Sequence, residues 1–297
     1  MATTVTVTSN YAGTTAGEII GKAFKELNTL QHITVYENIN YDLSLRRSQY
    51  ADGTRDYTCG HVPAGSITLD EKLLVPKKFK NDFEVCLETF RATWSDEKMG
   101  ASAKNAMPSD IENAIMADVL GATAEKIGTN IWIGSGATAG QFQGFIPQFV
   151  ADATVVKVTG TTSTIANVQD ELIKALSAIP TAIKGKTVKV FVSSNIFQNY
   201  TFSLIKSGIA ALGDAADKTA MFGKYMLVEE QGLPDNTIVI AEQKNLVFGT
   251  GLQSDFNNLY IDSTSPERQL DGLAKGTIVY SAGVSYYFGA EIVYYRP

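Results

Sequence analysis

The sequence contains few of the residues from which catalytic and metal sites are usually built. Its 297 residues include two histidines, His32 and His61, and two cysteines, Cys59 and Cys86. A nucleophilic triad would need one of these histidines, and no serine stands in a nucleophile-elbow pattern. Cys59 and His61 could supply two metal ligands, but no second ligand pair follows at the spacing of a zinc site. We therefore expect a protein that is not an enzyme and that holds no cofactor or metal ion.

Long apolar segments are also missing from the sequence. No run approaches the roughly 18 apolar residues that a membrane-spanning helix needs. Residues 1–10 have neither the basic nor the apolar region of a signal peptide. The cysteines are most simply interpreted as free thiols, and a disulfide between Cys59 and Cys86 stays open. The sequence predicts no membrane partner.

The charge and the residue types that are present describe a folded protein with substantial β structure. The apolar fraction is 44%, and 13 tyrosines and 14 phenylalanines far outnumber 2 tryptophans. Aromatic residues of this kind favour strands. The net charge of −6 argues against affinity for nucleic acid or an anionic membrane over the whole surface. The chain is long enough for two core-bearing units or for one elaborate unit.

The strongest helical pattern lies between residues 108 and 131. Pro108 suits a first helical turn, and Asp110 and Glu112 complement the positive end of the helix dipole. Gly134 and Gly136 are expected to end the helix, which would be about 35 Å long. Its apolar face repeats every fourth residue, through Ile111, Ile115, Val119, Thr123, Ile127 and Ile131.

The glycines that follow this helix are not a nucleotide-binding loop. Residues 134–140 read Gly-Ser-Gly-Ala-Thr-Ala-Gly. A dinucleotide fingerprint needs a strand before it and a helix after it. Here a predicted helix precedes the glycines and a loop is expected after them, so we interpret them as a helix-terminating turn.

The region from residue 36 to residue 91 has the pattern of a long hairpin. Ile39, Tyr41, Leu43 and Leu45 alternate with polar residues, as in a half-exposed strand. A polar, turn-rich tip is expected from Arg46 to Gly65. Apolar residues then resume on the way back, at Ile67, Leu69, Leu73, Val75, Phe83, Val85, Leu87 and Phe90. Since an isolated hairpin is barely stable in water, we expect a neighbour on which it lies.

The flanking regions differ from this hairpin. Residues 1–15 are expected to be a loose arm, followed by a short helix whose face includes Ile20, Phe24 and Leu27. Beyond residue 141 the pattern is α/β, with a flexible stretch expected over 210–223. We predict helices over 165–179 and 194–205, and strands over 188–192, 225–229, 237–241, 246–248, 259–261, 276–281 and 284–295.

In the order of its elements the chain resembles a tailed-bacteriophage major capsid protein of the HK97-like fold. The resemblance rests on an N-terminal arm and helix, an extended hairpin, a long helix, Gly144-Phe145-Ile146-Pro147 after it, and a strand–helix unit at 188–205. It implies an α+β fold with a hairpin E-loop, a spine helix, a peripheral domain and an α/β axial domain. The implied boundaries are 1–15 for the N-terminal arm, 16–35 for the N-terminal helix, 36–91 for the E-loop, 92–140 for the spine helix and peripheral domain, 141–265 for the axial domain, and 266–297 for a β return to the peripheral domain.

The resemblance also implies a function in a virion. Copies of the chain would form pentamers and hexamers of an icosahedral head, assembled in the host cytoplasm, that encloses double-stranded DNA with only weak contact. A separate scaffolding protein, a portal and decoration proteins would be further partners. No lysine occurs from residue 31 to residue 71, so we do not expect a lysine cross-link from the E-loop.

Charged residues near the expected hairpin tip are the candidate contacts between subunits. Mixed charges of this kind give specificity and register more than affinity, and a solvated hairpin tip is the alternative interpretation. The candidates are Arg46, Arg47, Asp52, Arg55 and Asp56.

Two other functions stay open: an encapsulin-type shell that holds an enzyme, and a soluble α/β domain that binds a ligand or catalyses a reaction.

Overall fold

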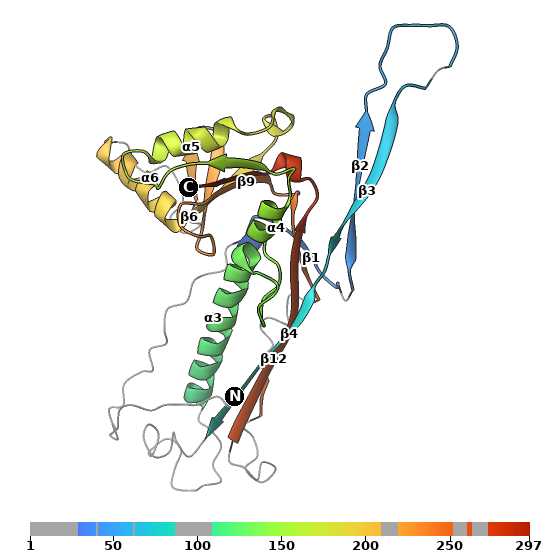
Figure 1. Ribbon diagram of the computed structural model, residues 1–297. Coiled ribbons are helices and arrows are strands. Elements are labelled where there is room, and N and C mark those ends of the chain that lie inside the picture. Colours follow the sequence, from blue (N-terminus) through green and yellow to red (C-terminus); the bar gives the residue numbers. More distant parts are fainter. Residues whose placement is uncertain are drawn as a thin grey trace, which may run out of the picture.

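The computed structural model describes residues 29–39, 41–61, 63–86, 109–208, 219–251, 260–262 and 273–297. These residues form a mixed α+β protein. A five-stranded sheet and a six-stranded sheet make up the body, and a two-stranded hairpin projects from it (Figure 1).

Along the described residues, four strands precede the two helices α3 and α4, a mixed α/β stretch follows, and strands predominate from β7 to the end. The helices are α3 (Ser109–Ile133), α4 (Phe145–Ala151), α5 (Val168–Ser177) and α6 (Ser194–Lys206), with 3-10 turns η1 (Thr29–Gln31), η2 (Thr181–Ile183) and η4 (Gly289–Glu291). The strands are β1 (Thr34–Tyr36), β2 (Leu43–Ala51), β3 (Ser66–Leu74), β4 (Lys77–Cys86), β5 (Val156–Thr159), β6 (Val188–Ser193), β7 (Thr219–Phe222), β8 (Tyr225–Glu230), β9 (Ile238–Glu242), β10 (Leu246–Thr250), β11 (Tyr260–Asp262), β12 (Leu273–Tyr286) and β13 (Val293–Arg296).

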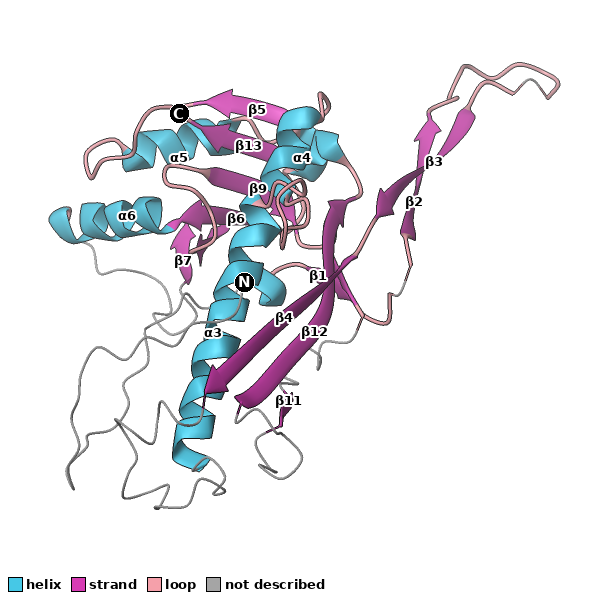
Figure 2. Ribbon diagram, turned by 60° about the horizontal axis from the view of Figure 1, so that its bottom comes forward, coloured by secondary structure: helices cyan, strands magenta, loops and turns pink. Residues whose placement is uncertain are grey.

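The five-stranded sheet is built around the long strand β12. Its order is β1-β10-β12-β11, with β4 also paired to β12. β4 and β12 run antiparallel from the Lys77–Ala282 pair to the Cys86–Leu273 pair. Helix α3 runs beside this ribbon (Figure 2). Phe79, Phe83 and Val119 help to fill the space between helix and sheet.

The six-stranded sheet has the order β5-β13-β9-β6-β8-β7. β5, β13, β6 and β8 point the same way, and β9 runs against its two neighbours. Helices α5 and α6 pack on one face, where Leu172, Leu204 and Leu227 belong to one core. On the other face, Phe191 and Val239 belong to the core that includes the end of α3. The strand-to-helix step at β6 and α6 agrees with the sequence prediction.

Helix α3 confirms the predicted long helix, but its apolar face is buried only toward its C-terminal end. Its 25 residues span about 37 Å. Thr123, Ile127 and Ile131 are buried, whereas the residues one and two turns earlier are only half-buried. Gly134 follows the helix as predicted, because a Cβ there would lie 2.2 Å from the carbonyl oxygen of Phe142.

The structure corrects the extent of the predicted hairpin. The two strands pair with each other only between Leu43 and Leu74. β4, expected as part of the returning strand, pairs instead with β12. Ile39 and Tyr41 lie in the connection before β2. The cause is a ladder formed with a segment near the end of the chain, which local alternation cannot reveal.

Four other predictions also differ from the structure. The helix predicted over 16–35 falls mostly outside the described residues, and its last part forms η1 and β1. Helix α4 occupies the expected loop after the glycines, and β7 forms within the stretch expected to be flexible. The strand predicted over 284–295 is divided, because its first residues belong to β12 in the five-stranded sheet, η4 interrupts it, and β13 joins the six-stranded sheet.

Candidate assembly surface

The candidate surface is the hairpin arm, defined here as Leu43–Leu74. β2 and β3 form a two-stranded sheet of their own, paired from Leu43–Leu74 to Ala51–Ser66. Side chains along a strand alternate between two faces. The arm therefore has an inner face, which meets the body near its root, and an outer face, which points away from it.

The root of the inner face is apolar and buried. The side chains of Leu45 and Leu74 are 2% and 0% exposed. They share a small core with Ile39 and Val247, the latter from β10. This core attaches the first pairs of the hairpin to the five-stranded sheet.

Arg47 makes the next contact along the inner face. Its Nε donates to Asp70 Oδ2 at 2.9 Å, and its Nη2 donates to the same oxygen. Its Nη1 donates to the backbone oxygen of Tyr287 at 2.6 Å, and the guanidinium lies 5.9 Å from the ring centroid of Phe288. The hydrogen bond from Arg47 lowers the pKa of Asp70. Arg47 thus joins both strands of the arm to the chain just after β12.

Lys72 makes a second charged contact on the same face. Its Nζ lies 3.1 Å from the ring centroid of Tyr286 and 3.7 Å from Asp152 Oδ2. Burial lowers the pKa of Lys72 to about 8, against the pull of Asp152. Asp152 also accepts hydrogen bonds from the Tyr286 hydroxyl at 2.6 Å and from the Thr154 amide at 2.8 Å. Burial alone would raise the pKa of Asp152, but these bonds lower it to about 2.

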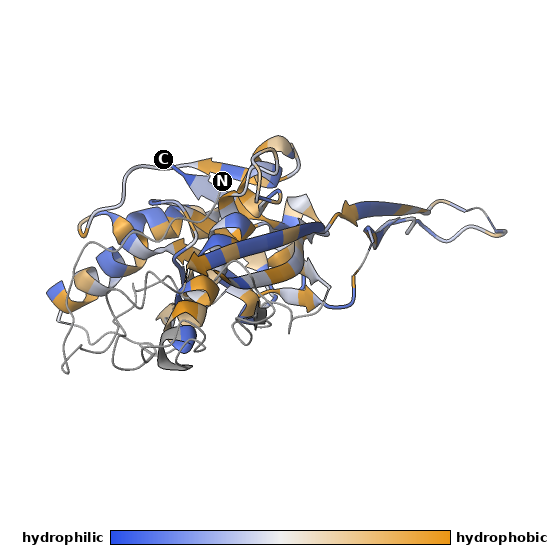
Figure 3. Ribbon diagram, turned by 90° about the horizontal axis from the view of Figure 1, so that it is seen from below, coloured by the Kyte–Doolittle hydropathy of each residue, from blue (hydrophilic) through white to orange (hydrophobic). Residues whose placement is uncertain are grey.

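The outer face of the arm exposes large apolar side chains. Tyr50, Ile67, Leu69 and Leu73 are 66%, 70%, 80% and 54% exposed. Figure 3 shows apolar segments along the arm beyond the body. Between them, Arg46 faces Glu71 across the ladder. This is an apolar strip interrupted by one pair of opposite charges.

The tip of the arm is a loop, in which residues 52–61 and 63–65 are described. Asp52 Oδ1 accepts the amide of Thr54 at 2.8 Å, and the hydroxyl of Thr54 helps to lower the pKa of Asp52. The loop closes where Gly53 meets Gly65, since a Cβ on Gly53 would lie 2.2 Å from Gly65 N. Arg55 and Asp56 are exposed beyond this neck.

The structure separates the five predicted contact residues. Asp52, Arg55 and Asp56 lie in the tip loop, as expected. Arg46 and Arg47 lie instead within β2, on opposite faces of the arm. Arg46 is exposed on the outer face, whereas Arg47 is engaged with its own chain. Whether any of the five contacts another subunit stays a prediction.

Lys72, Asp152 and Tyr286 were not identified from the sequence. The same alternation that places Leu45 and Leu74 on the inner face also places Lys72 there, which is the one local signal. Asp152 and Tyr286 come from distant segments, and nothing in their neighbouring residues indicates a contact with the arm.

We expect that Arg47→Ala loosens the root of the arm while Arg46→Ala does not. Loss of Arg47 removes a charge-assisted bond to the Tyr287 carbonyl, a class of bond worth about 1.5–3 kcal/mol. Hydrogen exchange over residues 43–47 and 284–288 should become on the order of ten-fold faster. Equal exchange rates in the two variants would contradict the anchoring function of Arg47.

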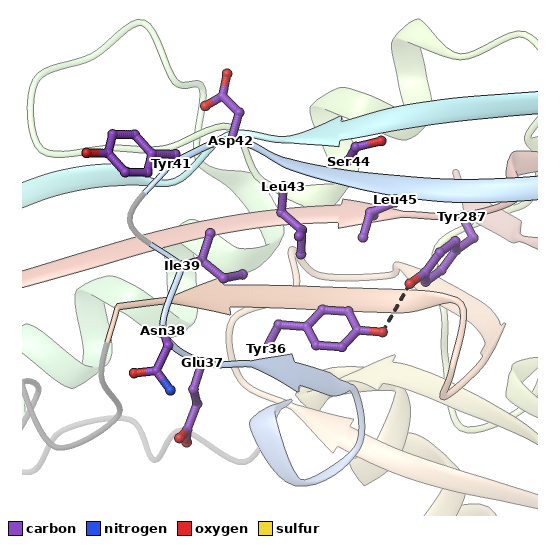
Figure 4. Close-up of a pocket in the computed structure, with 10 residues that line it drawn as sticks. All are labelled: Tyr36, Glu37, Asn38, Ile39, Tyr41, Asp42, Leu43, Ser44, Leu45 and Tyr287. Carbon is purple, nitrogen blue, oxygen red and sulfur yellow. Dashed lines mark hydrogen bonds between the residues drawn. The ribbon is translucent and has the colours of Figure 1, made fainter.

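An open pocket of about 500 Å³ lies at the root of the arm. Figure 4 shows the apolar side chains Ile39, Leu43 and Leu45 at its centre. The hydroxyls of Tyr36 and Tyr287 lie 3.0 Å apart at one end. The pocket follows from the connection between β1 and β2, which bridges the five-stranded sheet and the arm.

The described residues provide neither a metal-binding cluster nor a membrane-spanning helix. Those residues contain no group of three or more His, Cys, Asp or Glu side chains placed to hold a metal ion. Among the described helices, none combines the length and the apolar character needed to cross a bilayer.

The fold is similar to that of solved shell proteins. The capsid of an empty GTA particle matches with a TM-score of 0.63 and 11% identity, over 96% of this chain and 94% of that chain. A structure from Mycobacterium phage Che8 matches with a TM-score of 0.62 and 14% identity, over 99% and 98%. A virus-like particle from Pyrococcus furiosus matches with a TM-score of 0.51 and 10% identity, over 90% and 91%. No protein-family model and no curated protein matches the sequence. At these identities the likeness shows the fold, which is that of phage capsid shells.

Proposed function

We propose that this chain is the major capsid protein of a tailed bacteriophage. In this proposal the hairpin arm is the E-loop of an HK97-like fold and α3 is the spine helix. The five-stranded sheet belongs to the peripheral domain, and the six-stranded sheet with α5 and α6 is the axial domain. The likeness to capsids over nearly the whole chain supports this assignment.

The observation that carries the proposal is the apolar outer face of the arm. Ile67 and Leu69, on the outer face of β3, are largely exposed. The hairpin arm that carries them has no core of its own along most of its length. Exposed apolar patches of this kind mark interaction sites. A second copy of the chain is the partner proposed here, because an arm laid on the next copy in turn makes a head-to-tail contact, and such contacts form a ring when the rotation between copies closes. Such rings would be the pentamers and hexamers of an icosahedral head.

We expect the purified chain to assemble into rings or shells, alone or with a scaffolding protein. Sedimentation velocity over a range of concentrations should show species much larger than the 32.1 kDa subunit. Negative-stain microscopy should show rings or closed particles. Only monomers at every concentration, with scaffold and crowding agents present, would refute the proposal.

An encapsulin-type shell is the alternative. The likeness to a virus-like particle supports it, because that particle shares the fold. The two functions differ in their contents. Mass spectrometry and nucleic-acid staining of particles from the natural source decide between them. DNA with portal and tail proteins supports the phage head, and one abundant enzyme without DNA supports the nanocompartment.

A soluble ligand-binding or enzymatic α/β domain, the third hypothesis, gives no reason for an apolar outer face on the arm.

We expect the free subunit to bind double-stranded DNA only weakly. The net charge is −6, and the polar residues of α3 include Glu112, Asp118 and Glu125 with Lys126. Dense packing requires DNA to slide, and each additional phosphate contact would resist sliding. Fluorescence anisotropy at about 150 mM salt should give a dissociation constant no tighter than roughly 10⁻⁶ M, the range of non-specific binding. A sub-micromolar constant would contradict the expectation of weak contact.

A further inference from the structure

The pocket at the root of the arm has a fixed wall and an apolar floor (Figure 4). On its floor, Ile39 and Leu45 are 7% and 2% exposed. The Ile39 amide donates to the Thr250 carbonyl of β10 at 3.0 Å, which ties the wall to the five-stranded sheet. Asn38, with a φ of 62°, turns the chain just before it. A preformed pocket of about 500 Å³ with an apolar floor is of the size and kind that binds a guest.

The rim and one end of this pocket are polar. The described residues that line it include the exposed carboxylates of Glu37 and Asp42 but no lysine or arginine. At one end, the hydroxyls of Tyr36 and Tyr287 lie 3.0 Å apart. One hydroxyl hydrogen serves the bond between them, so the other can be donated to a guest. The pocket therefore fits a guest that has an aromatic ring, a polar end and a positive charge beside the ring.

The tip loop of the arm carries such a guest. The side chain of Tyr57 is 93% exposed, and Arg55, two residues earlier, is also exposed. A tyrosine is an apolar ring that ends in a hydroxyl. Tyrosine and arginine are among the side chains that most often dominate the binding energy of an interface. Asp56 lies between them and must face away from the acidic rim.

The tip of an arm cannot enter the pocket of its own chain. The ladder between root and tip runs through nine residue pairs, from Leu43–Leu74 to Ala51–Ser66. At about 3.4 Å per residue, the two ends of the ladder are roughly 27 Å apart. Figure 1 shows the tip at the end of the arm that points away from the body. A tip that occupies this pocket therefore comes from a second copy.

We propose that the pocket at the root of one copy's arm receives the tip loop of the next copy. The Tyr57 ring lies on the apolar floor, and the Arg55 guanidinium pairs with Glu37 and Asp42 at the rim. This inference rests on the proposed function, because it gives the head-to-tail contact between copies a defined end point. The outer face contributes area along the arm, and the tip sets the register at which one copy lies on the next.

A photo-cross-linker in the pocket identifies its occupant. One population of chains carries benzophenone maleimide at Tyr41→Cys in a Cys59→Ser, Cys86→Ser background. Tyr41 lines the pocket and is 86% exposed, so its replacement removes little from the fold. Before assembly this population is mixed with an excess of wild-type chains labelled with ¹⁵N. Mass spectrometry should find the probe joined to the ¹⁵N-labelled tryptic peptide 56–72, which includes Tyr57. The same probe at Ile173→Cys, on α5 and 54% exposed, is the control and should not join this peptide.

Substitutions in the tip loop measure the contribution of the contact to assembly. Tyr57→Ala should raise the concentration at which half of the subunits assemble by on the order of ten- to a hundred-fold. Arg55→Glu should also weaken assembly, and Glu37→Lys with Asp42→Lys in the same chain should restore it, because opposite charges then meet again. Asp56→Asn is the matched control in the same loop and should assemble as the wild type does. Sedimentation velocity measures all of these variants.

The outcomes separate this inference from the proposed function. Rings that form without the ¹⁵N tip peptide at the pocket overturn the inference and leave the shell function intact. A peptide from residues 1–28 at position 41, or any segment other than the tip loop, does the same, and so does a Tyr57→Ala chain that assembles as the wild type does. Subunits that stay monomeric and give no tip peptide contradict both. The cross-link reports on wild-type tips, so a tip variant that fails to fold does not affect that test.

Discussion

Replacing Ile67 and Leu69 together with glutamate should abolish assembly while leaving the subunit folded. Both side chains lie on the outer face and are 70% and 80% exposed, so their replacement removes little from the core. Burying each of them against a partner is worth about 1.5–3 kcal/mol. The double variant should therefore weaken each contact by on the order of 10²–10⁴-fold. Sedimentation velocity measures assembly, and circular dichroism reports the fold.

The strand itself supplies the matched control. Thr68 lies between the two residues and is exposed, but alternation places it on the inner face. Thr68→Glu adds negative charge at the same position along the arm without touching the apolar strip. We expect it to assemble nearly as well as the wild type. If Thr68→Glu and the double variant fail equally, charge on the arm is responsible and the outer face has no special function.

Local patterns predicted the elements whose partners are near in sequence. The four-residue repeat predicted α3, and the β-branched run ending at Ser193 predicted β6 and the start of α6. These patterns can be recognised in the sequence because α3 buries one face, which gives a helical repeat of apolar residues, and β6 is buried along its length, which gives a short apolar run. The helix end was also predictable, since Gly134 is required where a Cβ would meet a carbonyl oxygen.

The partners of strands were not predictable in the same way. β4 has the same alternation whether it pairs with β2 or with β12, and the choice of β12 depends on residues about two thirds of the chain length away. The hairpin was therefore predicted too long. The same limit explains why Lys72 and its contacts with Asp152 and Tyr286 were not found. The sequence also could not show that Arg46 lies on the outer face of the arm and Arg47 on the inner face, because the face that each residue of a strand occupies depends on the register of the strand.

The two faces of the arm have different functions: the inner face attaches the arm to the body, and the outer face is exposed. On the inner face, Arg47 donates to the backbone oxygen of Tyr287 in the same chain, so its replacement should change the direction of the arm. On the outer face, Leu69 has no function in the subunit's own core. Failure of assembly thus has two separable causes, a misdirected arm and a damaged surface. A distance measured between the tip of the arm and the body distinguishes them, since only a misdirected arm changes that distance.

The largest loss of subunit stability is expected for Trp132→Ala. Trp132 is 0% exposed, and its ring centroid lies 5.5 Å from that of Phe145 and 5.4 Å from that of Phe191. Its Nε1 donates to Thr29 Oγ1 at 3.3 Å, and Thr29 in turn donates to Glu230 Oε2 at 2.6 Å. One side chain therefore joins the end of α3 to α4, to the six-stranded sheet and to η1.

Truncating a buried tryptophan typically costs about 3–5 kcal/mol, because the lost burial adds to the cavity left behind. The melting temperature should fall by roughly 6–20 °C, given about 2–4 °C per kcal/mol for domains of this general size. Differential scanning calorimetry should be done on dilute, unassembled subunits, since assembly stabilises the folded state by mass action. The neighbouring Ile133→Ala is the control, because Ile133 is 42% exposed and should lose far less. If the two variants melt together, the junction at Trp132 does not hold the two sheets in one cooperative unit.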